Sequence, residues 1–389
     1  MYSENITIFA EYDPEIYMIE RSLLPELLRN MKDKKAIVLL GARQTGKTTL
    51  INELVQDVPD VIRFTGDDPA AQRAMTDVSQ GELEQLIGAA KVVVIDEAQR
   101  IDRVGLTAKI MIDQLDLKVI LSGSSALELN NRIQEPLTGR KWTYNLFPIT
   151  WNELVHHNGL LGARGKLKEV LVSGTYPEVL TAQADRDRVL RELADSYLFK
   201  DIFALTGIRK PRALVDLLRA LAWQVGQEVS MSEVARTVGI DMKTAEQYVQ
   251  YLEQGYIVFR LGPYSRNLRT ELRSKQKIYF WDNGIRNAVI GDLSPFVQRQ
   301  DAGALWENYI VSEIHKRNSY AASGARLFYW RTVQQQEIDL LEEHNGKLRA
   351  MEIKWSPKSK ARIPKTFVHA YPDATFEVIH SENFERFFG

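Results

Sequence analysis

The sequence predicts an α/β protein with a parallel sheet in its N-terminal part, a helical middle region and a second α/β domain at its C-terminal end. Two unbroken apolar runs, AIVLL at 36–40 and VVVI at 92–95, are typical of strands that a parallel sheet buries on both faces. In the middle region, apolar side chains recur at helical spacing. Helical and strand-like stretches alternate after residue 300, and 389 residues are enough for two or three domains.

Composition and charge are those of an ordinary globular protein, with 44% hydrophobic residues, 26% charged residues and a formal net charge of −1. The absence of cysteine excludes disulfide bonds and thiolate metal sites. No apolar run approaches the ~20 residues of a membrane span. Residues 1–17 are acidic and contain no Lys or Arg, so they do not form the basic start of a signal or transit peptide. We therefore expect a cytoplasmic protein with no membrane partner.

The stretch GARQTGKT at 41–48 has the spacing of a phosphate-binding loop. It follows the apolar run 36–40 and precedes a helical pattern, which is the order of strand, loop and helix in the Walker A motif. In such a loop glycines let backbone N–H groups wrap the phosphates, Lys47 reaches the β and γ phosphates, and the Thr48 hydroxyl binds Mg²⁺. The residues expected to bind the nucleotide are Gly41, Ala42, Arg43, Gln44, Thr45, Gly46, Lys47, Thr48 and Thr49.

The second apolar run ends in an acidic pair, Asp96 and Glu97. Open α/β sheets place their ligands at the carboxyl ends of strands, and this pair follows the Walker A motif by about 50 residues. It is therefore a Walker B box. We expect Asp96 to bind the Mg²⁺ shell and Glu97 to orient and polarise the attacking water, which predicts ATP and Mg²⁺ as ligands and ATP hydrolysis as the reaction.

A third strand, 118–121, ends in serines that can reach the same edge of the sheet. Ser122 is a candidate sensor of the γ phosphate, whereas Ser124 and Ser125 can equally cap the following helix. Further on, Arg132 and Arg140 are candidate arginine fingers, the catalytic role being assigned to Arg140. The alternative for either is a surface or ion-paired arginine.

The middle region predicts a helix-turn-helix, because the helical stretches within 229–252 are separated by a turn at Gly239. The strand at 256–261 follows it like the wing of a winged helix. The second helix offers a mixed, uncharged face, which favours packing or protein contact over phosphate contact. A better candidate for contacting nucleic acid is the basic run that follows, unless it is a solvated linker. That run contains Arg266, Arg269, Arg273, Lys275 and Lys277.

Together these motifs resemble those of a large family of prokaryotic AAA+/STAND-like P-loop ATPases. The resemblance rests on GARQTGKTTL, VIDEAQ, ILSGSS, LTGR, FPITWNEL and GTYPEVL, and it covers roughly residues 18–389. It implies an AAA+-like ATPase core, a winged-helix segment and a C-terminal domain of unknown function that resembles the PD-(D/E)XK restriction-endonuclease fold.

The last third reads as a helix, three strands, a helix and a strand, the α-β-β-β-α-β order of nuclease-like folds. The resemblance then implies a site for Mg²⁺ or Mn²⁺ formed by Glu307, Asp339 and Glu352, with Lys354 as a catalytic residue. Period-2 geometry places Glu352 and Lys354 on one face of their strand. The alternative is a fold that keeps this architecture without the activity.

The sequence therefore predicts three parts: a P-loop ATPase domain (1–155), a helical and winged-helix region (156–262) and a nuclease-like domain (263–389). One hypothesis is an ATPase whose nucleotide state controls a C-terminal domain that acts on DNA. The other is a signalling or scaffold ATPase whose later domains only bind protein or nucleic acid. DNA, a protein partner and a second copy of the chain all stay open as partners.

Overall fold

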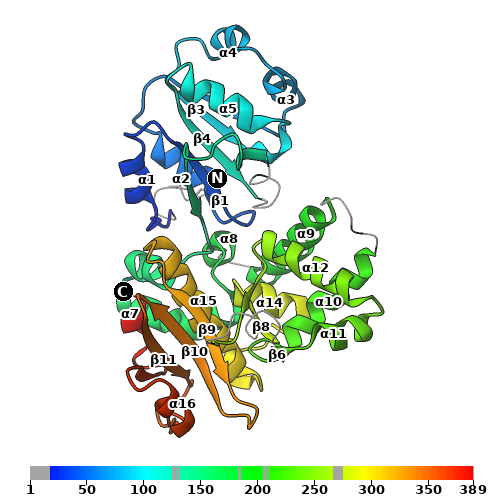
Figure 1. Ribbon diagram of the computed structural model, residues 1–389, viewed down its shortest axis with the longest axis vertical. Coiled ribbons are helices and arrows are strands. Elements are labelled where there is room, and N and C mark those ends of the chain that lie inside the picture. Colours follow the sequence, from blue (N-terminus) through cyan, green and yellow to red (C-terminus); the bar gives the residue numbers. More distant parts are fainter. Residues whose placement is uncertain are drawn as a thin grey trace, which may run out of the picture.

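The computed structural model describes residues 18–388 apart from 125–128, 130–131, 183–184, 205–207, 209 and 266–274, and without the side chains of 196–204. The N-terminal sheet and its helices form one lobe, and the remaining helices and two further sheets form the other (Figure 1). Part of the basic run expected to follow the helix-turn-helix lies outside the described residues, as does the helix start expected after Ser124. These undescribed positions are Ser125, Arg266, Arg269 and Arg273.

The N-terminal lobe contains the predicted parallel sheet, which is confirmed. Its five strands pair in the order β2-β3-β4-β1-β5, and every pairing is parallel. Strand β4 lies between β1 and β3, so the strand that carries Ser122 separates the strands that lead to the phosphate-binding loop and the acidic pair. The strands are β1 (Ala36–Leu40), β2 (Val61–Thr65), β3 (Val92–Asp96), β4 (Lys118–Gly123) and β5 (Lys141–Asn145).

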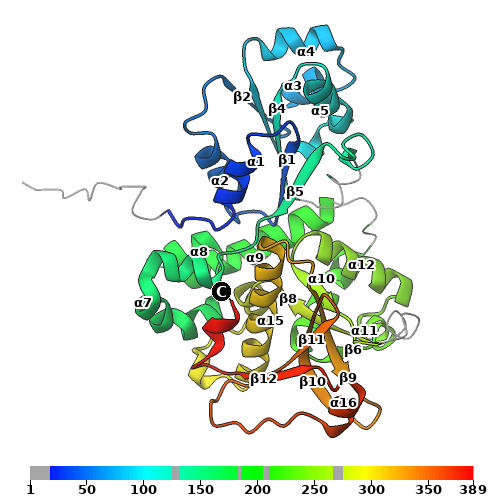
Figure 2. The ribbon, with the colours of Figure 1, turned by 60° about the vertical axis from the view of Figure 1, so that its left-hand side comes forward.

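Helices cover both faces of this sheet (Figure 2). Ile37 and Leu39 of β1 pack in a cluster with α1 and α2. The alternate side chains, Val38 and Leu40, belong to the larger core that includes α4 and α5. Both faces of β1 are thus buried, which explains its unbroken apolar sequence. The helices are α1 (Leu24–Asn30), α2 (Lys47–Leu54), α3 (Pro69–Met75), α4 (Gln80–Ile87) and α5 (Val104–Asp113).

The C-terminal part has the element order predicted from the sequence. Its sheet is mixed, in the order β12-β11-β10-β9, because β9, β10 and β11 are antiparallel neighbours and β12 is parallel to β11. Helix α15 packs on one face of this sheet and α16 on the other. The elements are α15 (Ala302–Tyr320), β9 (Arg326–Arg331), β10 (Glu337–His344), β11 (Lys347–Ile353), α16 (Lys365–Ala370) and β12 (Thr375–Ile379).

The middle part contains the predicted helices on either side of Gly239, which has φ +73° and ends the first of them. A three-stranded antiparallel sheet, β6-β8-β7, lies beside them. The elements are α7 (Trp151–Ser173), α8 (Pro177–Thr181), α9 (Arg186–Ala204), α10 (Pro211–Trp223), β6 (Glu228–Val229), α11 (Met231–Val238), α12 (Met242–Gln254), β7 (Val258–Leu261), β8 (Gln276–Phe280) and α14 (Asn283–Ile290).

The expected boundaries after residues 155 and 262 do not separate independent units. Helix α7 runs through the first boundary and packs against α14 and α15. Strand β8 lies beyond the second boundary, yet it pairs with β6 and β7. The predicted boundaries lie between motifs. In the structure, helix α7 spans the first boundary, and the three-stranded sheet combines strands from both sides of the second.

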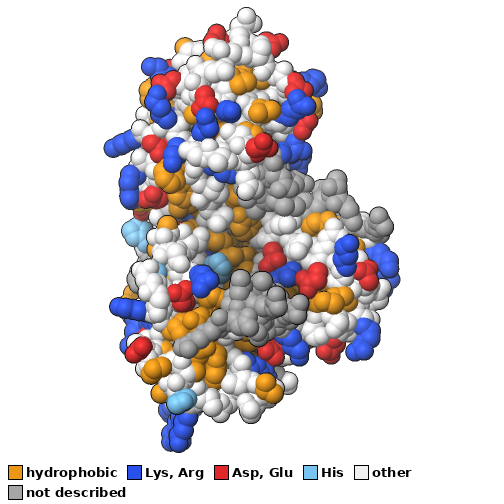
Figure 3. Space-filling view, viewed as in Figure 1, with side chains coloured by type: hydrophobic (Ala, Val, Ile, Leu, Met, Phe, Trp, Pro, Cys, Tyr) orange, Lys and Arg blue, Asp and Glu red, His pale blue; other side chains and the backbone are white. Residues whose placement is uncertain are grey.

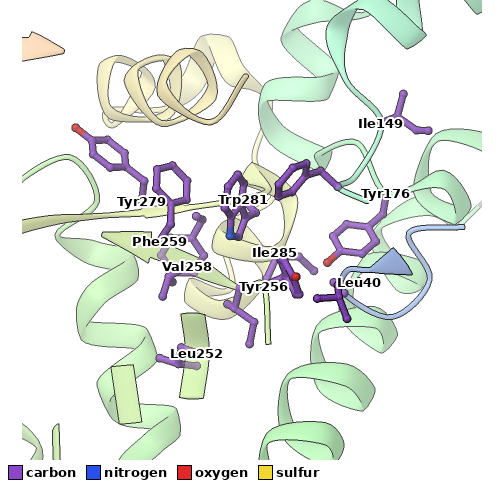
Figure 4. Close-up of a cluster of buried hydrophobic side chains, with 14 of the residues drawn as sticks. Leu40, Ile149, Tyr176, Leu252, Tyr256, Val258, Phe259, Tyr279, Trp281 and Ile285 are labelled. Carbon is purple, nitrogen blue, oxygen red and sulfur yellow. The ribbon is translucent and has the colours of Figure 1, made fainter. Parts of the chain in front are cut away.

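A single hydrophobic core connects the two lobes. It includes Leu40 at the end of β1, Tyr176 before α8, and Tyr256 and Trp281 from the middle part. Figure 4 shows these side chains converging from separate elements. In the part of the chain that the structure describes, no helix has both the length and the apolar sequence needed to cross a membrane.

Candidate functional site

Two glycines of the phosphate-binding loop are required by its backbone geometry. A Cβ atom on Gly41 would lie 2.2 Å from the carbonyl oxygen of Leu146, so any side chain there would collide with the backbone after β5. Gly46 has φ +93°, in the left-handed region, and is the N-cap of α2. The loop therefore curls closely against the sheet and leads directly into the helix.

Lys47 is buried at the centre of this loop, with 6% of its surface exposed. Its ammonium donates hydrogen bonds to the carbonyl oxygens of Gly41 (2.9 Å) and Ala42 (2.8 Å). The hydroxyl of Thr45 donates to the same Ala42 oxygen at 2.8 Å. The loop thus holds one positive charge inside its own turn.

Thr48 and Asp96 come from separate motifs and meet at the edge of the sheet. The Thr48 hydroxyl donates to Asp96 Oδ2 at 2.8 Å. Ser122, which is fully buried, donates its hydroxyl to Asp96 Oδ1. Each carboxylate oxygen of Asp96 therefore has its own hydroxyl partner. Strand β4 places the candidate sensor, Ser122, directly beside Asp96.

Glu97 is held by a second set of polar groups. Its Oε2 accepts hydrogen bonds from Ser124 Oγ (2.9 Å) and Gln99 Nε2 (2.5 Å), and these two side chains also contact each other at 3.2 Å. Its backbone has φ +47°, a left-handed conformation that is uncommon for a residue with a side chain. The carboxylate is thus fixed in direction from both its backbone and its side chain.

A cavity of about 500 Å³ lies over the loop and is lined by Lys47, Asp96 and Glu97, among others. Its far wall is formed by Pro177 and Glu178 of α8, which belongs to the middle part. An adjoining cavity of about 410 Å³ shares four of these lining residues and is otherwise mainly apolar. The shared residues are Gly46, Thr49, Pro177 and Glu178, and the apolar ones include Met18, Ile19, Leu50 and Ile149.

The structure places both candidate arginine fingers away from this cavity. Arg132 pairs with Asp102 at 2.9 Å, and Arg140 pairs with Asp113 at 2.8 Å. Arg140 directly precedes β5, so it lies at the amino edge of a parallel sheet whose carboxyl edge carries the loop. A catalytic role for Arg140 in the site of its own chain is therefore wrong, because the strand direction puts it at the opposite edge.

A second group of charged residues gathers in the C-terminal part, and we refer to it as the C-terminal charge cluster. It brings together all four residues predicted there, from α15, β10 and the end of β11, with two more residues from β8 and β10. The members are Lys277, Glu307, Glu337, Asp339, Glu352 and Lys354.

Each of the two lysines in this cluster pairs with two carboxylates. Lys354 Nζ lies 2.7 Å from Glu352 and 3.1 Å from Asp339. Lys277 Nζ lies 2.6 Å from Glu337 and 3.2 Å from Glu307. Asp339 also accepts the backbone N–H of Ile353 at 2.7 Å, and Tyr279 donates its hydroxyl to Glu307 at 2.6 Å.

Burial raises the pKa of Glu307 to about 7, with Asp339 adding to the rise and Lys277 opposing it. Burial and Asp339 also raise the pKa of Glu352. For Lys354, burial would lower the pKa, but the two neighbouring carboxylates raise it overall. In the described ranges no three Asp, Glu or His side chains are arranged to hold an ion, and Glu307, Asp339 and Glu352 pair with lysines instead, so their role as metal ligands stays a prediction. The lysines occupy the positions between the carboxylates.

Sequence reasoning missed several residues that complete these sites. Pro177 and Glu178 stand in the GTYPEVL stretch, and Gln99 ends the VIDEAQ stretch, so the motifs contained a signal that was used only for the family resemblance. Lys277 and Glu337 gave no such signal. Lys277 stands within the basic run, and nothing in the sequence relates Glu337 to the other carboxylates of the cluster.

Comparisons with known families divide the chain into three. Residues 33–155 match the model of an AAA domain. Residues 164–295 match a domain of unknown function, DUF8612, and residues 302–385 match another, DUF4143.

Relatives with similarity over most of the chain come from bacteria and archaea. The uncharacterized protein Rv2008c of Mycobacterium tuberculosis is 27% identical over 347 residues, which cover 87% of this chain and 74% of the relative. The uncharacterized protein MJ1637 of Methanocaldococcus jannaschii is 23% identical, with 81% of this chain and 76% of the relative covered. The similarity therefore crosses all three matched regions.

Solved structures with detectable similarity include the Walker-type ATPase PABY2304 of Pyrococcus abyssi, which is 17% identical and covers 70% of this chain and 96% of its own, with a TM-score of 0.48. Cdc6p of Pyrobaculum aerophilum is 15% identical and covers 72% of this chain and 97% of its own, with a TM-score of 0.31. Residues 33–155 thus match an AAA domain and contain the five-stranded parallel sheet with the phosphate-binding loop.

Proposed function

We propose that this protein binds and hydrolyses ATP with Mg²⁺. The observation that carries the proposal is the 2.8 Å hydrogen bond between Thr48 Oγ1 and Asp96 Oδ2, which brings two oxygen ligands from separate motifs to the wall of one cavity. Hydroxyl and carboxylate oxygens suit Mg²⁺, so the residues present fit this ion. When bound, Mg²⁺ neutralises charge on the β and γ phosphate oxygens.

The residues around the cavity have distinct roles in this proposal. Lys47 exchanges its loop carbonyl partners for phosphate oxygens. Glu97 orients the attacking water and accepts hydrogen bonding from it, held in direction by Ser124 and Gln99. Ser122 keeps Asp96 in place. The adjoining cavity, which is mainly apolar but is also lined by Arg21 and Glu53, takes the base, because a purine ring prefers apolar walls with few polar groups.

Two variants test the proposal. Lys47→Ala is expected to lose ATP binding in calorimetry, because the loop then lacks its charge partner for the phosphates. Glu97→Gln is expected to bind ATP and Mg²⁺ like the wild type but to release phosphate ~10²-fold more slowly, or slower still, since only water activation is impaired. Glu84→Gln is the matched control, because Glu84 lies on the exposed side of α4. Wild-type turnover in Glu97→Gln would refute the role of Glu97.

A second proposal concerns the C-terminal charge cluster, because the fold brings the four predicted residues together from three elements. We propose phosphodiester cleavage of DNA, controlled by the nucleotide state, as its candidate activity. Carboxylate oxygens are suitable ligands for Mg²⁺ or Mn²⁺, but an ion would first have to displace Lys354 from Asp339 and Glu352. Lys354 itself is then free to neutralise charge on a phosphate.

This second proposal is tested by Mn²⁺-dependent cleavage of plasmid and single-stranded DNA, with and without ATP. Asp339→Asn is expected to abolish cleavage. Glu343→Gln is the matched control, because Glu343 lies on the same strand and pairs outside the cluster with Arg326. Cleavage that persists in Asp339→Asn would place the activity elsewhere. Absence of cleavage and of Mn²⁺ binding in the wild type would leave this part as a binding domain, as in the scaffold alternative.

A further inference from the structure

Arg21, just before α1, connects the phosphate-binding loop to two other segments. Only 5% of its surface is exposed. One terminal nitrogen donates to the carbonyl oxygen of Thr45 at 2.5 Å and the other to that of Phe147 at 2.6 Å, while Nε donates to Glu153 Oε1 at 3.2 Å. The rigid guanidinium fork thus joins the loop, the segment after β5 and the first turn of α7.

The bond to Thr45 sets the direction of a backbone group in the loop. The carbonyl of Thr45 and the N–H of Gly46 belong to one planar trans peptide and point in opposite directions. Because Arg21 holds the carbonyl, the Gly46 N–H is directed away from Arg21. Gly46 lines the cavity over the loop, and backbone N–H groups at this position are the ones that bind phosphate.

The segment from Phe147 to Glu153 carries these contacts onward to α15. Tyr320, the last residue of α15, accepts the backbone N–H of Phe147 with its hydroxyl at 3.2 Å. At the start of α7, the N–H of Trp151 donates to Glu313 of α15 at 2.7 Å. One short segment therefore contacts Arg21 and, at two points, helix α15.

Electrostatics keeps this link intact. Burial would lower the pKa of Arg21, but Glu153 and then Tyr320 raise it overall, so the guanidinium stays charged. Burial and Glu153 raise the pKa of Tyr320, so its hydroxyl stays protonated. Glu153 is also fixed by two backbone donors, Ser22 at 2.8 Å and Thr150 at 2.9 Å. Each nitrogen of the Arg21 guanidinium and each carboxylate oxygen of Glu153 therefore has a hydrogen-bond partner, as a buried charged pair requires.

We propose that Arg21 is a positioning residue that couples nucleotide binding in the loop to the position of helix α15. The inference rests on the proposed ATP binding and deepens it. A phosphate that draws the Gly46 N–H also moves the Thr45 carbonyl, and Arg21 passes this change to the segment that holds α15. Glu307 lies 13 residues before Tyr320 on the same helix, about 20 Å away, so the C-terminal charge cluster is at the far end of this link.

The test combines calorimetry with hydrogen–deuterium exchange of the full chain, with and without ATP and Mg²⁺. In the wild type, ATP is expected to change deuterium uptake in peptides from 302–320. Tyr320→Phe is expected to bind ATP within twofold of the wild type while losing at least half of that change. Arg21→Gln is expected to weaken ATP binding about tenfold, and Arg21→Lys, which keeps the charge without the fork, to recover part of the affinity only.

Matched controls are Arg188→Gln, an exposed arginine paired with Glu192, and Tyr251→Phe, which loses a hydroxyl bonded within α12. Both are expected to behave like the wild type. If ATP binds the wild type without altering uptake in α15, the coupling is refuted and the ATPase proposal stands. If the wild type binds no ATP, both are refuted. A full change in Tyr320→Phe would overturn the coupling even if Arg21→Gln did not fold.

Discussion

Asp96 shows how one side chain depends on two neighbours from different elements, helix α2 and strand β4. The Thr48 and Ser122 hydroxyls each occupy one of its oxygens, which leaves the carboxylate oriented toward the cavity side of the sheet. Asp96→Asn keeps the shape but removes the negative charge that a divalent cation needs. We expect the Mg²⁺ dependence of ATP binding to weaken about tenfold or more, measured by titrating Mg²⁺ at fixed ATP. Unchanged Mg²⁺ dependence would count against the assignment.

Gln99 and Ser124 supply a second test at the same scale. They hold one oxygen of Glu97, so a double replacement by alanine is expected to lower kcat by about tenfold with little effect on KM, because the water-orienting group loses its fixed direction. Steady-state kinetics separates the two parameters. An increase in kcat would show instead that these bonds restrain Glu97 from its working position.

Single residues could be predicted where a motif fixes both type and spacing. The Walker residues are of this kind, since their order along the chain already implies the strand, the loop and the helix. Arg140 was misplaced relative to the site of its own chain because its motif, LTGR, gives no information about which edge of the sheet it occupies. Arg21 and Tyr320 gave no signal, because a buried arginine is recognisable only once its distant acceptors are known.

Helix α15 gives a prediction at the scale of an element. Burial, together with Asp339, raises the pKa of Glu307 to about 7 in the folded protein, above its ordinary value of 4.5. The folded state therefore binds this proton more tightly than the unfolded state does, and the stabilisation is present at low pH and lost as pH rises from about 4.5 through 7. At ~1.4 kcal/mol per pKa unit, a rise of about 2.5 units corresponds to a loss of about 3.5 kcal/mol.

Glu307→Gln removes this dependence, because the amide does not titrate. The melting temperature of the wild type, relative to Glu307→Gln, is therefore expected to fall between pH 5 and pH 8, by about 2–4 °C for each kcal/mol. Thermal unfolding of both proteins across this range checks it. Parallel profiles for the two proteins would contradict the raised pKa.

The positions of helices and strands were predictable from periodicity, whereas the pairing of strands in sheets was not. The order of helix and strands in the C-terminal part was correct because alternation and apolar spacing are local signals. The pairing of strand β8 with β6 and β7 was not predicted, since nothing in its sequence identifies these strands as its neighbours. The resemblance of the C-terminal part to a nuclease stays a prediction.

At the scale of the whole molecule, DNA binding by the middle part is expected to be weak. Figure 3 shows acidic and basic side chains interspersed over the visible face. Arg260 of β7 forms ion pairs with Glu246 and Glu253 of α12, at 2.8 and 3.1 Å. Lys243→Gln, on the exposed face of α12, is therefore expected to change the salt slope of DNA binding by much less than one unit. Filter binding across a salt series measures this slope. A decrease of about one unit would show direct phosphate contact by α12.

Helix α8 forms one wall of both cavities, although it lies beyond the residues that match the AAA domain. A shortened protein that ends at residue 155 keeps every Walker residue, yet the base and the phosphates would face open solvent on one side. The same cut would strip the apolar core from Leu40 outward. Residues 33–155 therefore do not contain the whole of either cavity. A cut that separated them from α8 would break up both cavities, so the nucleotide-binding unit that we propose extends into the middle part.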